Sequence, residues 1–211
     1  MNRLSTLNRV IIKFFVTVKN IKKIAYYYYG ETPLSLLKFL YNSGLRINTF
    51  IVYENDLTRE LPEHNLDPGY RVIKPTLDEL AKIKEGKELP REFYYDDIFN
   101  AKTCYLVFKE NELALIYWVL FKGDYSRFLI LGNKVAELNY QTTLPKFRGN
   151  HLMEKMTAYI SRDLKEAGHK KLMAVPNEYN YPSIKSFERT GFKKIAIIKT
   201  LGPFNRKIMI N

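Results

Sequence analysis

The sequence is poor in the residues that build disulfides and metal clusters. It has one cysteine, Cys104, and three histidines, His64, His151 and His169, among 211 residues. A single cysteine excludes an internal disulfide and a thiolate metal cluster, and the histidines are too far apart in sequence to suggest a shared metal site. We therefore predict no metal centre. Cys104 lies in an apolar segment, so we expect a small buried core residue rather than a nucleophile.

The sequence also lacks a long apolar run and is short of acidic residues. Its most apolar N-terminal stretch, residues 10–18, is too short to cross a bilayer and contains Lys13. No secretory signal is evident, so the cytoplasm is the expected location. Lysine and arginine number 34 against 22 aspartate and glutamate residues, which gives a net charge of +12. This excess favours anionic partners, namely nucleotide phosphates, anionic lipid or nucleic acid, without selecting among them.

Residues 3–29 have the pattern of a long amphipathic helix whose charges are all positive. Two interpretations remain open. The apolar face can pack on the protein's own core or on a partner subunit, as in a homodimer. Alternatively, the helix can lie on an anionic membrane surface and make the protein membrane-peripheral. In either case we expect this helix to be separable from any chemistry.

A second helix is predicted to begin at Thr32, a hydroxyl N-cap followed by proline, and to end at Gly44. Its expected buried side carries three leucines: Leu36, Leu37 and Leu40. A strand over residues 47–54 and a polar, proline-containing stretch follow. These features predict an N-terminal helix-helix-strand extension over residues 1–66 and a second domain over residues 67–211.

The segment from 144 to 153 reads Leu-Pro-Lys-Phe-Arg-Gly-Asn-His-Leu-Met. A polar strand precedes it, and an amphipathic helix over residues 150–167 follows. The first amides of a helix have no internal partners, and the helix dipole places a partial positive charge there, so a pyrophosphate can bind. Gly149 would form the turn of a backbone nest. The alternative is an ordinary connection between a strand and a helix.

The strand before this segment, residues 135–143, has an unusual row of polar side chains. Strict alternation places four of them on one face: Glu137, Asn139, Gln141 and Thr143. Buried polar groups need partners, which a functional site could provide. The alternative is a solvated face at a splayed strand end. If the face does line a site, Glu137 is our candidate for the general base.

The order of patterns after residue 70 predicts the fold class. A strand, two helices, a run of strands, a helix, a strand, a helix and two strands follow one another. The run of strands includes a short one at residues 128–131. This order predicts an α/β fold, with a mixed sheet and helices on both faces.

Two motifs carry a resemblance to a known family. Arg148 matches the first position of a phosphate-binding motif, although His151 stands where this motif usually has glycine and Met153 where it has glycine or alanine. A second signature is well matched by four residues: Asn180, Ser183, Gly191 and Phe192. In this order and spacing, the chain from about residue 70 resembles the GNAT acyltransferase superfamily. The resemblance implies a mostly antiparallel central sheet, with the N-terminal helical extension added to it.

The resemblance also implies a cofactor, acetyl-CoA or another acyl-CoA, and its binding residues. The pyrophosphate would bind Arg148, Gly149, Asn150, His151, Leu152 and Met153. The pantetheine arm would pair with the backbone of Thr142, Thr143 and Leu144, where a β-bulge would aim an N–H at the thioester carbonyl. On the far side of the cleft the binding residues would be Asn180, Ser183 and Phe187.

Four candidate site residues carry open questions. His151 can still direct its N–H at phosphate if the turn keeps helical angles. Phe187 stands where the family often has a tyrosine that protonates the departing thiolate, which phenylalanine cannot do. Tyr94 and Tyr95 lie in the region next to the family's acceptor pocket, although surface packing is an alternative role for both.

We therefore expect an N-acyltransferase that moves an acetyl or other acyl group from acyl-CoA to a small amine, such as an amino sugar or an amino acid. The alternative is a catalytically inactive GNAT-fold protein that binds CoA or a nucleotide as a sensor or assembly component. His151 and Phe187 favour that alternative. A membrane-surface or nucleic-acid-binding module ranks last, because no clustered basic-aromatic motif supports nucleic acid recognition.

Overall fold

The computed structural model describes residues 22, 25–26, 30–44, 47–201 and 206–210. Most of the helix predicted over residues 3–29 lies outside these residues, although Lys22, Ala25 and Tyr26 are helical. The chain divides into two compact units, Met1–Thr49 with Ile198–Ile210 and Phe50–Ile197. In the described residues, no helix is long and apolar enough to span a bilayer.

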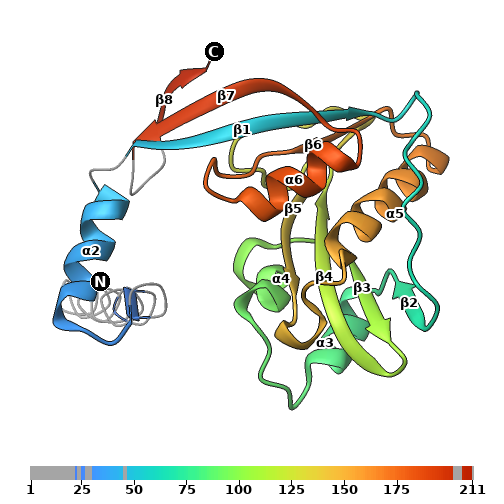
Figure 1. Cartoon of the computed structure of the whole chain (residues 1–211), viewed down its shortest axis with the longest axis horizontal. Helices are drawn as coiled ribbons and strands as arrows, with labels where there is room; N and C mark the ends of the chain where they lie inside the picture. Colours follow the sequence, from blue (N-terminus) through green and yellow to red (C-terminus); the bar gives the residue numbers. More distant parts are fainter. Residues whose placement is uncertain (1–21, 23–24, 27–29, 45–46, 202–205, 211) are drawn as a thin grey trace, which may run out of the picture. The chain divides into compact units, whose positions relative to one another are not determined.

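The larger unit consists of a sheet with its helices (Figure 1). Its strands, two of which extend into the smaller unit, are β1 (Ile47–Asp56), β2 (Tyr70–Ile73), β3 (Thr103–Lys109), β4 (Glu112–Leu120), β5 (Val135–Thr143), β6 (Lys171–Ala174) and β7 (Lys193–Leu201). Its helices are α3 (Leu77–Lys84), α4 (Tyr95–Phe99), α5 (Leu152–Glu166) and α6 (Tyr181–Arg189), with short 3-10 helices η1 (Arg91–Tyr94) and η2 (Pro145–Phe147). The expected order of elements is confirmed, except that residues 128–131 form no strand.

The strands lie in the order β2-β3-β4-β5-β6-β1-β7. Four neighbouring pairs, β2–β3, β3–β4, β4–β5 and β6–β1, are antiparallel, and β5–β6 is parallel. The expected mixed, mostly antiparallel sheet is therefore confirmed. β1 lies between β6 and β7, so this strand from the N-terminal part of the chain belongs to the sheet. The structure divides the chain at residues 49 and 197, and not at residue 66.

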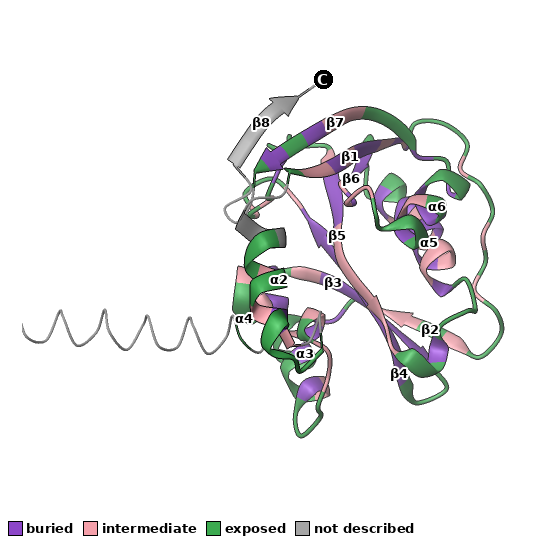
Figure 2. Ribbon diagram, turned by 60° about the vertical axis from the view of Figure 1, so that its left-hand side comes forward, coloured by how far each residue is buried: buried purple, intermediate pink, exposed green. Residues whose placement is uncertain are grey.

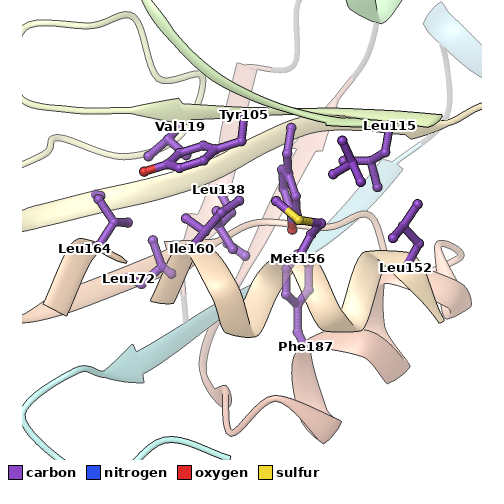
Figure 3. Packing of buried hydrophobic residues seen from close by; sticks show 14 of the residues in the cluster. Tyr105, Leu115, Val119, Leu138, Leu152, Met156, Ile160, Leu164, Leu172 and Phe187 are labelled. Carbon is purple, nitrogen blue, oxygen red and sulfur yellow. The ribbon is translucent and has the colours of Figure 1, made fainter. Parts of the chain in front are cut away.

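A separate hydrophobic cluster lies on each face of the sheet, because side chains of a strand alternate between faces. On one face, Tyr105, Leu115 and Val119 pack against the apolar side of α5, with Phe187 from α6 below it (Figure 3). On the other face, Leu106, Ile116 and Trp118 pack against α3, η1 and α4. The central strands are accordingly buried, whereas the outer sides of the helices are exposed (Figure 2).

Two sequence predictions in this unit have clear physical support. Thr76 caps α3, and Glu79 completes a capping box by accepting a hydrogen bond from the Thr76 N–H at 2.8 Å. Cys104 is 1% exposed on β3, and burial raises the pKa of its thiol to about 12. The thiol is therefore protonated at neutral pH, which agrees with a core residue and not with a nucleophile.

The smaller unit contains α2 (Pro33–Gly44), the outer ends of β1 and β7, and β8 (Arg206–Ile210), which pairs with β7 in antiparallel fashion. The prediction that its helix buries three leucines is wrong for two of them. Leu37 and Leu40 are 62% and 50% exposed, and Leu36 is half-buried. Ser35 is the buried residue instead, and its hydroxyl donates to the Gly30 carbonyl.

Candidate active site

A cleft opens where two neighbouring strands of the sheet part. The parallel β5–β6 ladder runs from the pair Val135 and Lys171 to the pair Leu138 and Ala174. Beyond that pair the strands no longer hydrogen-bond, and residues of β5 and of the segment that follows β6 line a cleft of about 810 Å³. Helix α5 follows β5 and helix α6 follows β6, so a helix borders the cleft on each side. Such a topological opening is where α/β folds commonly bind ligands.

Most residues predicted for the site line this cleft. They are Tyr95, Glu137, Thr142, Thr143, Arg148, Gly149, His151, Leu152, Met153, Asn180, Ser183 and Phe187. Their roles in binding stay predictions, but the chain brings them together from α4, β5, the turn before α5, α5 and α6.

Three of the predicted residues are held elsewhere. Tyr94 donates from its hydroxyl to the Lys87 carbonyl at 3.0 Å, away from the cleft. Leu144 is also outside the lining, and its N–H donates to the Ala114 carbonyl at 2.9 Å. That amide is therefore not available to a pantetheine arm. Asn150 turns back, with Nδ2 donating to the Phe147 carbonyl at 3.3 Å.

A β-bulge interrupts β5 at Tyr140, which has a φ of 47°. Asn139 pairs with Trp118 and Gln141 pairs with Tyr117, so Tyr140 is the extra residue. The bulge lies earlier than predicted, since we placed it at residues 142–144. It also reverses the alternation, and the prediction that four polar residues share a face is therefore wrong.

The bulge sends the polar residues of β5 to opposite faces. Asn139 stays on the side of Glu137, where Nδ2 donates to Oε1 of Glu137 at 3.0 Å. Gln141 instead faces α6, where Nε2 donates to the Ser183 hydroxyl at 3.2 Å. Tyr140 packs its ring against Tyr95 on α4, with centroids 4.3 Å apart. One strand therefore contributes side chains to the cleft from both faces of the sheet.

The turn before α5 forms a row of free backbone amides. Gly149 has a φ of 84° and His151 a φ of 51°. In the described part of the chain, the N–H groups of residues 149–154 have no hydrogen-bond acceptor, and the first bonded amide is that of Lys155. These amides lie at the N-terminus of a 15-residue helix. Their number and place suit a pyrophosphate, which needs several donors near a positive dipole end.

His151 differs from its prediction. The helix begins at Leu152 and not at residue 150, because His151 adopts the left-handed conformation instead of helical angles. That conformation costs a non-glycine residue about 1–2 kcal/mol. The His151 ring contacts Glu154 across 3.2 Å, and Arg189 of α6 donates to the same carboxylate at 2.8 Å. Burial alone would raise the pKa of Glu154, but these two partners hold it below its usual value.

Glu137 has the properties of a general base. It is 1% exposed, and burial raises the pKa of its carboxyl to about 7, although the side chains of Ser126 and Asn139 act in the opposite direction. Its second oxygen, Oε2, is buried and has no hydrogen-bond partner among the described residues. A base whose pKa lies near 7 can both accept and release a proton at neutral pH.

Two neighbouring residues of α6, Ser186 and Phe187, line the cleft, and neither is a tyrosine. Phe187 is 2% exposed and packs its ring against Phe192, with centroids 5.1 Å apart. Ser186, which the sequence reasoning missed, is also 2% exposed and lines the cleft. Its Oγ has no hydrogen-bond partner in the described residues. A serine inside a helix carries no sequence signal that separates this position from a solvated one.

The sequence reasoning also missed an aromatic and basic wall of the cleft. Phe50 from β1, Arg127 and Phe128 from the loop after β4, and Tyr140 line it. Only the bulge brings Tyr140 to this wall, and only the insertion of β1 beside β6 brings Phe50 there. In the described residues, no group of three or more histidine, cysteine or acidic side chains could hold a metal ion.

The comparisons with known proteins agree with this geometry. A family described as "FR47-like protein" matches residues 128–200, from the loop before β5 almost to the end of β7. A search of curated proteins found no match. The solved structures discussed below are less than 25% identical to this chain, so they show the fold alone.

Three similar structures illustrate the fold. A putative GNAT acetyltransferase from Novosphingobium aromaticivorans has a TM-score of 0.50 at 16% identity, over 73% of this chain and 63% of its own. A GCN5-related N-acetyltransferase from Sphaerobacter thermophilus has a TM-score of 0.52 at 12% identity, over 79% and 55%. A tandem GNAT protein from the clavulanic acid biosynthesis pathway has a TM-score of 0.50 at 18% identity, over 77% and 56%. This chain spans less than two thirds of each. The family match and the fold together confirm the resemblance seen in the sequence, and the chain has the fold of the GNAT acetyltransferases.

Proposed function

We propose that the protein is an N-acyltransferase that uses acetyl-CoA or another acyl-CoA as donor and a small amine as acceptor. The observation that carries the proposal is the arrangement of two groups in one cleft. A row of free amides at residues 149–154 suits the pyrophosphate of the donor. Glu137, buried on the same cleft with a pKa of about 7, suits the activation of an amine.

The donor would supply an activated acyl group. A new bond forms between the amine nitrogen and the acyl carbon, the carbon–sulfur bond breaks, and CoA leaves as a free thiol. An ammonium ion has no lone pair for this attack, so it must first lose a proton. Glu137 accepts that proton, directly or through a water molecule. Because the carboxylate is buried, its basicity is higher than that of an exposed glutamate.

Basic side chains near the free amides would add to the binding of the donor. Arg148 follows η2 and fixes its guanidinium by donating from Nε to the Thr143 carbonyl at 3.1 Å. Lys185 and Arg189 of α6 line the opposite side of the same region. Charge-assisted contacts to phosphate are stronger than neutral ones, which suits a donor with several phosphate groups.

Calorimetric titration with acetyl-CoA and with free CoA tests the donor site. We expect binding of both, and weaker binding for Arg148→Ala. Arg59→Ala is the matched control, because Arg59 pairs with Asp56 outside the cleft. Thiol release across a panel of amines then tests transfer. Absence of CoA binding, or equal affinity in all three proteins, contradicts the donor site, and CoA binding without thiol release from any amine contradicts the enzyme.

A further inference from the structure

Arg127 is a cation in the cleft without an anionic partner. Its guanidinium lies over the rings of Phe50 and Phe128, 5.1 and 4.9 Å from their centroids. Within the described residues it makes no ion pair and no hydrogen bond, and loss of water around the guanidinium lowers its pKa. Removing part of the water from a charge has a cost that a counter-ion normally offsets. No side chain of the described residues pairs with Arg127 as a counter-ion.

Arg127 and Glu137 lie around one point of the cleft, the hydroxyl of Tyr140. Burial raises the pKa of this hydroxyl. The charge of Arg127 and, less strongly, that of Arg91 lower the pKa, whereas Glu137 and Tyr125 raise it. Arg127, Glu137 and Tyr140 all line the cleft. An acceptor placed beside Tyr140 would therefore meet a carboxylate and an unpaired guanidinium at the same time.

We propose that the acceptor is an amino acid, whose carboxylate binds Arg127 while its amine meets Glu137. This inference rests on the proposed acyl transfer and adds the substrate class to it. The planar guanidinium offers two parallel N–H donors that match the two oxygens of a carboxylate. The rings of Phe50 and Phe128 hold the guanidinium in place, so little conformational freedom is lost when the acceptor binds.

The charges of the cleft favour a carboxylate over a phosphate. Its other cationic side chains, Arg148, Lys185 and Arg189, come from the turn before α5 and from α6. Arg148 bonds the Thr143 carbonyl and Arg189 pairs with Glu154, which places both on the donor side. Among the residues that line the cleft, Arg127 is therefore the one cationic side chain beside Phe50, Phe128 and Tyr140. One charge balances a carboxylate, whereas a phosphate monoester carries up to two negative charges.

Matched pairs of ligands test the inference on the whole chain. Each pair is an amino acid and the amine without its carboxylate: phenylalanine with phenethylamine, and alanine with ethylamine. Binding is measured by calorimetry and transfer by thiol release. For the wild-type protein we expect the amino acid of at least one pair to bind about tenfold tighter and to react with a correspondingly higher kcat/KM, as a charge-assisted pair predicts.

Arg127→Gln should remove this preference, mainly through weaker binding of the amino acid, and should leave the affinity for acetyl-CoA unchanged. Arg71→Gln is the matched control, since Arg71 also lies over an aromatic ring, that of Phe108 at 5.0 Å, but does not line the cleft. It should keep the preference.

The outcomes separate this inference from the proposed function. Binding that prefers the amino acid and depends on Arg127, but without thiol release, supports the carboxylate site and contradicts the transferase. Thiol release with no preference for the carboxylate in either pair, or a preference that persists in Arg127→Gln, overturns the inference. Loss of acetyl-CoA affinity in Arg127→Gln, or a stronger response to O-phosphoethanolamine than to the amino acids, also overturns it.

Discussion

Asn139 donates a hydrogen bond to Oε1 of Glu137 across 3.0 Å, while Oε2 of the same carboxylate is buried and has no partner in the described part of the chain. The two residues are neighbours on one face of β5, before the bulge at Tyr140. The bond fixes the carboxylate, and the unpaired oxygen is left for a ligand in the cleft. Such an oxygen is costly in a folded protein unless a ligand or water satisfies it. This pairing explains why Glu137 can be positioned precisely enough for proton transfer.

The first prediction concerns the rate of transfer. The kcat/KM of the wild-type protein should rise with pH as Glu137 ionises, with a midpoint near its pKa of about 7. Glu137→Gln should lower kcat/KM by about 10²–10⁴-fold and remove this rise. Thiol release from pH 5.5 to 8.5 measures both. Glu88→Gln, a change of an exposed glutamate on the loop after α3, is the control, and an unaltered profile in Glu137→Gln would exclude Glu137 as the base.

The second prediction concerns stability and follows from the same pKa. The pKa of Glu137 rises from 4.5 to about 7 on folding, so the folded state favours the protonated carboxyl. This contribution is fully present below about pH 4.5 and is lost as pH rises to about 7. The difference corresponds to about 3 kcal/mol, because one pKa unit is worth about 1.4 kcal/mol. Glutamine does not ionise, so Glu137→Gln should gain stability relative to the wild type over this range.

Urea unfolding at pH 4.5 and at pH 7.5 measures this change. Comparison of the two proteins at each pH cancels the titration of all other groups. If the difference in unfolding free energy between them is the same at both pH values, the pKa of Glu137 is not raised in the folded protein.

Much of the fold could be predicted from the sequence because it depends on local signals. Apolar periodicity predicted the amphipathic helix α5, and the capping box of Thr76 and Glu79 predicted the start of α3. The positions of these elements around the sheet followed from the order of parts. Local signals of this kind are repeated over many residues, so one unusual position does not change the prediction of a helix or a strand.

The parts that the sequence did not predict depend on single backbone angles or on distant pairing. The positive φ of Tyr140 reverses the faces of all later residues in β5, and alternation alone cannot detect it. Arg127 becomes part of the cleft wall only when β1 brings Phe50 beside it. Strand 47–54 was predicted, but its place between β6 and β7 needs knowledge of long-range pairing.

The third prediction concerns His151, whose φ of 51° is left-handed. Asparagine tolerates this conformation well, whereas a β-branched residue does not. His151→Asn should therefore keep the affinity for acetyl-CoA within a few-fold. His151→Val should weaken it by about tenfold or more, because the left-handed conformation costs a non-glycine residue about 1–2 kcal/mol and a β-branched one more, so that valine leaves this conformation and redirects the amides of the turn. Calorimetric titration with acetyl-CoA measures both, and equal affinities would show that the turn is not the phosphate site.

The fourth prediction concerns strand β1 and the residues before it. A chain that starts at Ile47 keeps β1, whereas a chain that starts at Asp67 loses the strand that pairs with β6 from Tyr53 to Asp56. It also loses Leu57, which is fully buried in the core. We expect the first chain to unfold cooperatively and the second to fail to fold. Circular dichroism on heating checks this, and a cooperative transition in the shorter chain would show that β1 is dispensable.

The last prediction concerns the hydroxyl that meets the departing thiolate. Phe187 offers none, and its ring lies in the core between Tyr53 and Phe192, with centroids 6.2 and 5.1 Å away. A hydroxyl added by Phe187→Tyr would need a partner there, and without one it would cost about 1–3 kcal/mol. We therefore expect Phe187→Tyr to lower Tm without raising turnover. The neighbouring Ser186 lines the cleft, and its buried Oγ has no partner among the described residues, so this hydroxyl can donate.

Ser186→Ala should accordingly lower kcat while leaving the affinity for acetyl-CoA unchanged, because the thiolate charge develops only in the transition state. Loss of a single donor of this kind costs about 10²–10³-fold when it stabilises the full charge, and less for a thiolate, which leaves more easily than an alkoxide. Ser161→Ala is the matched control, since Ser161 is buried in α5 and donates to the Thr157 carbonyl at 2.8 Å. A kcat for Ser186→Ala equal to that of the wild type, measured where chemistry limits the rate, would rule out this hydroxyl. A rise in turnover in Phe187→Tyr would place the missing donor at residue 187 instead.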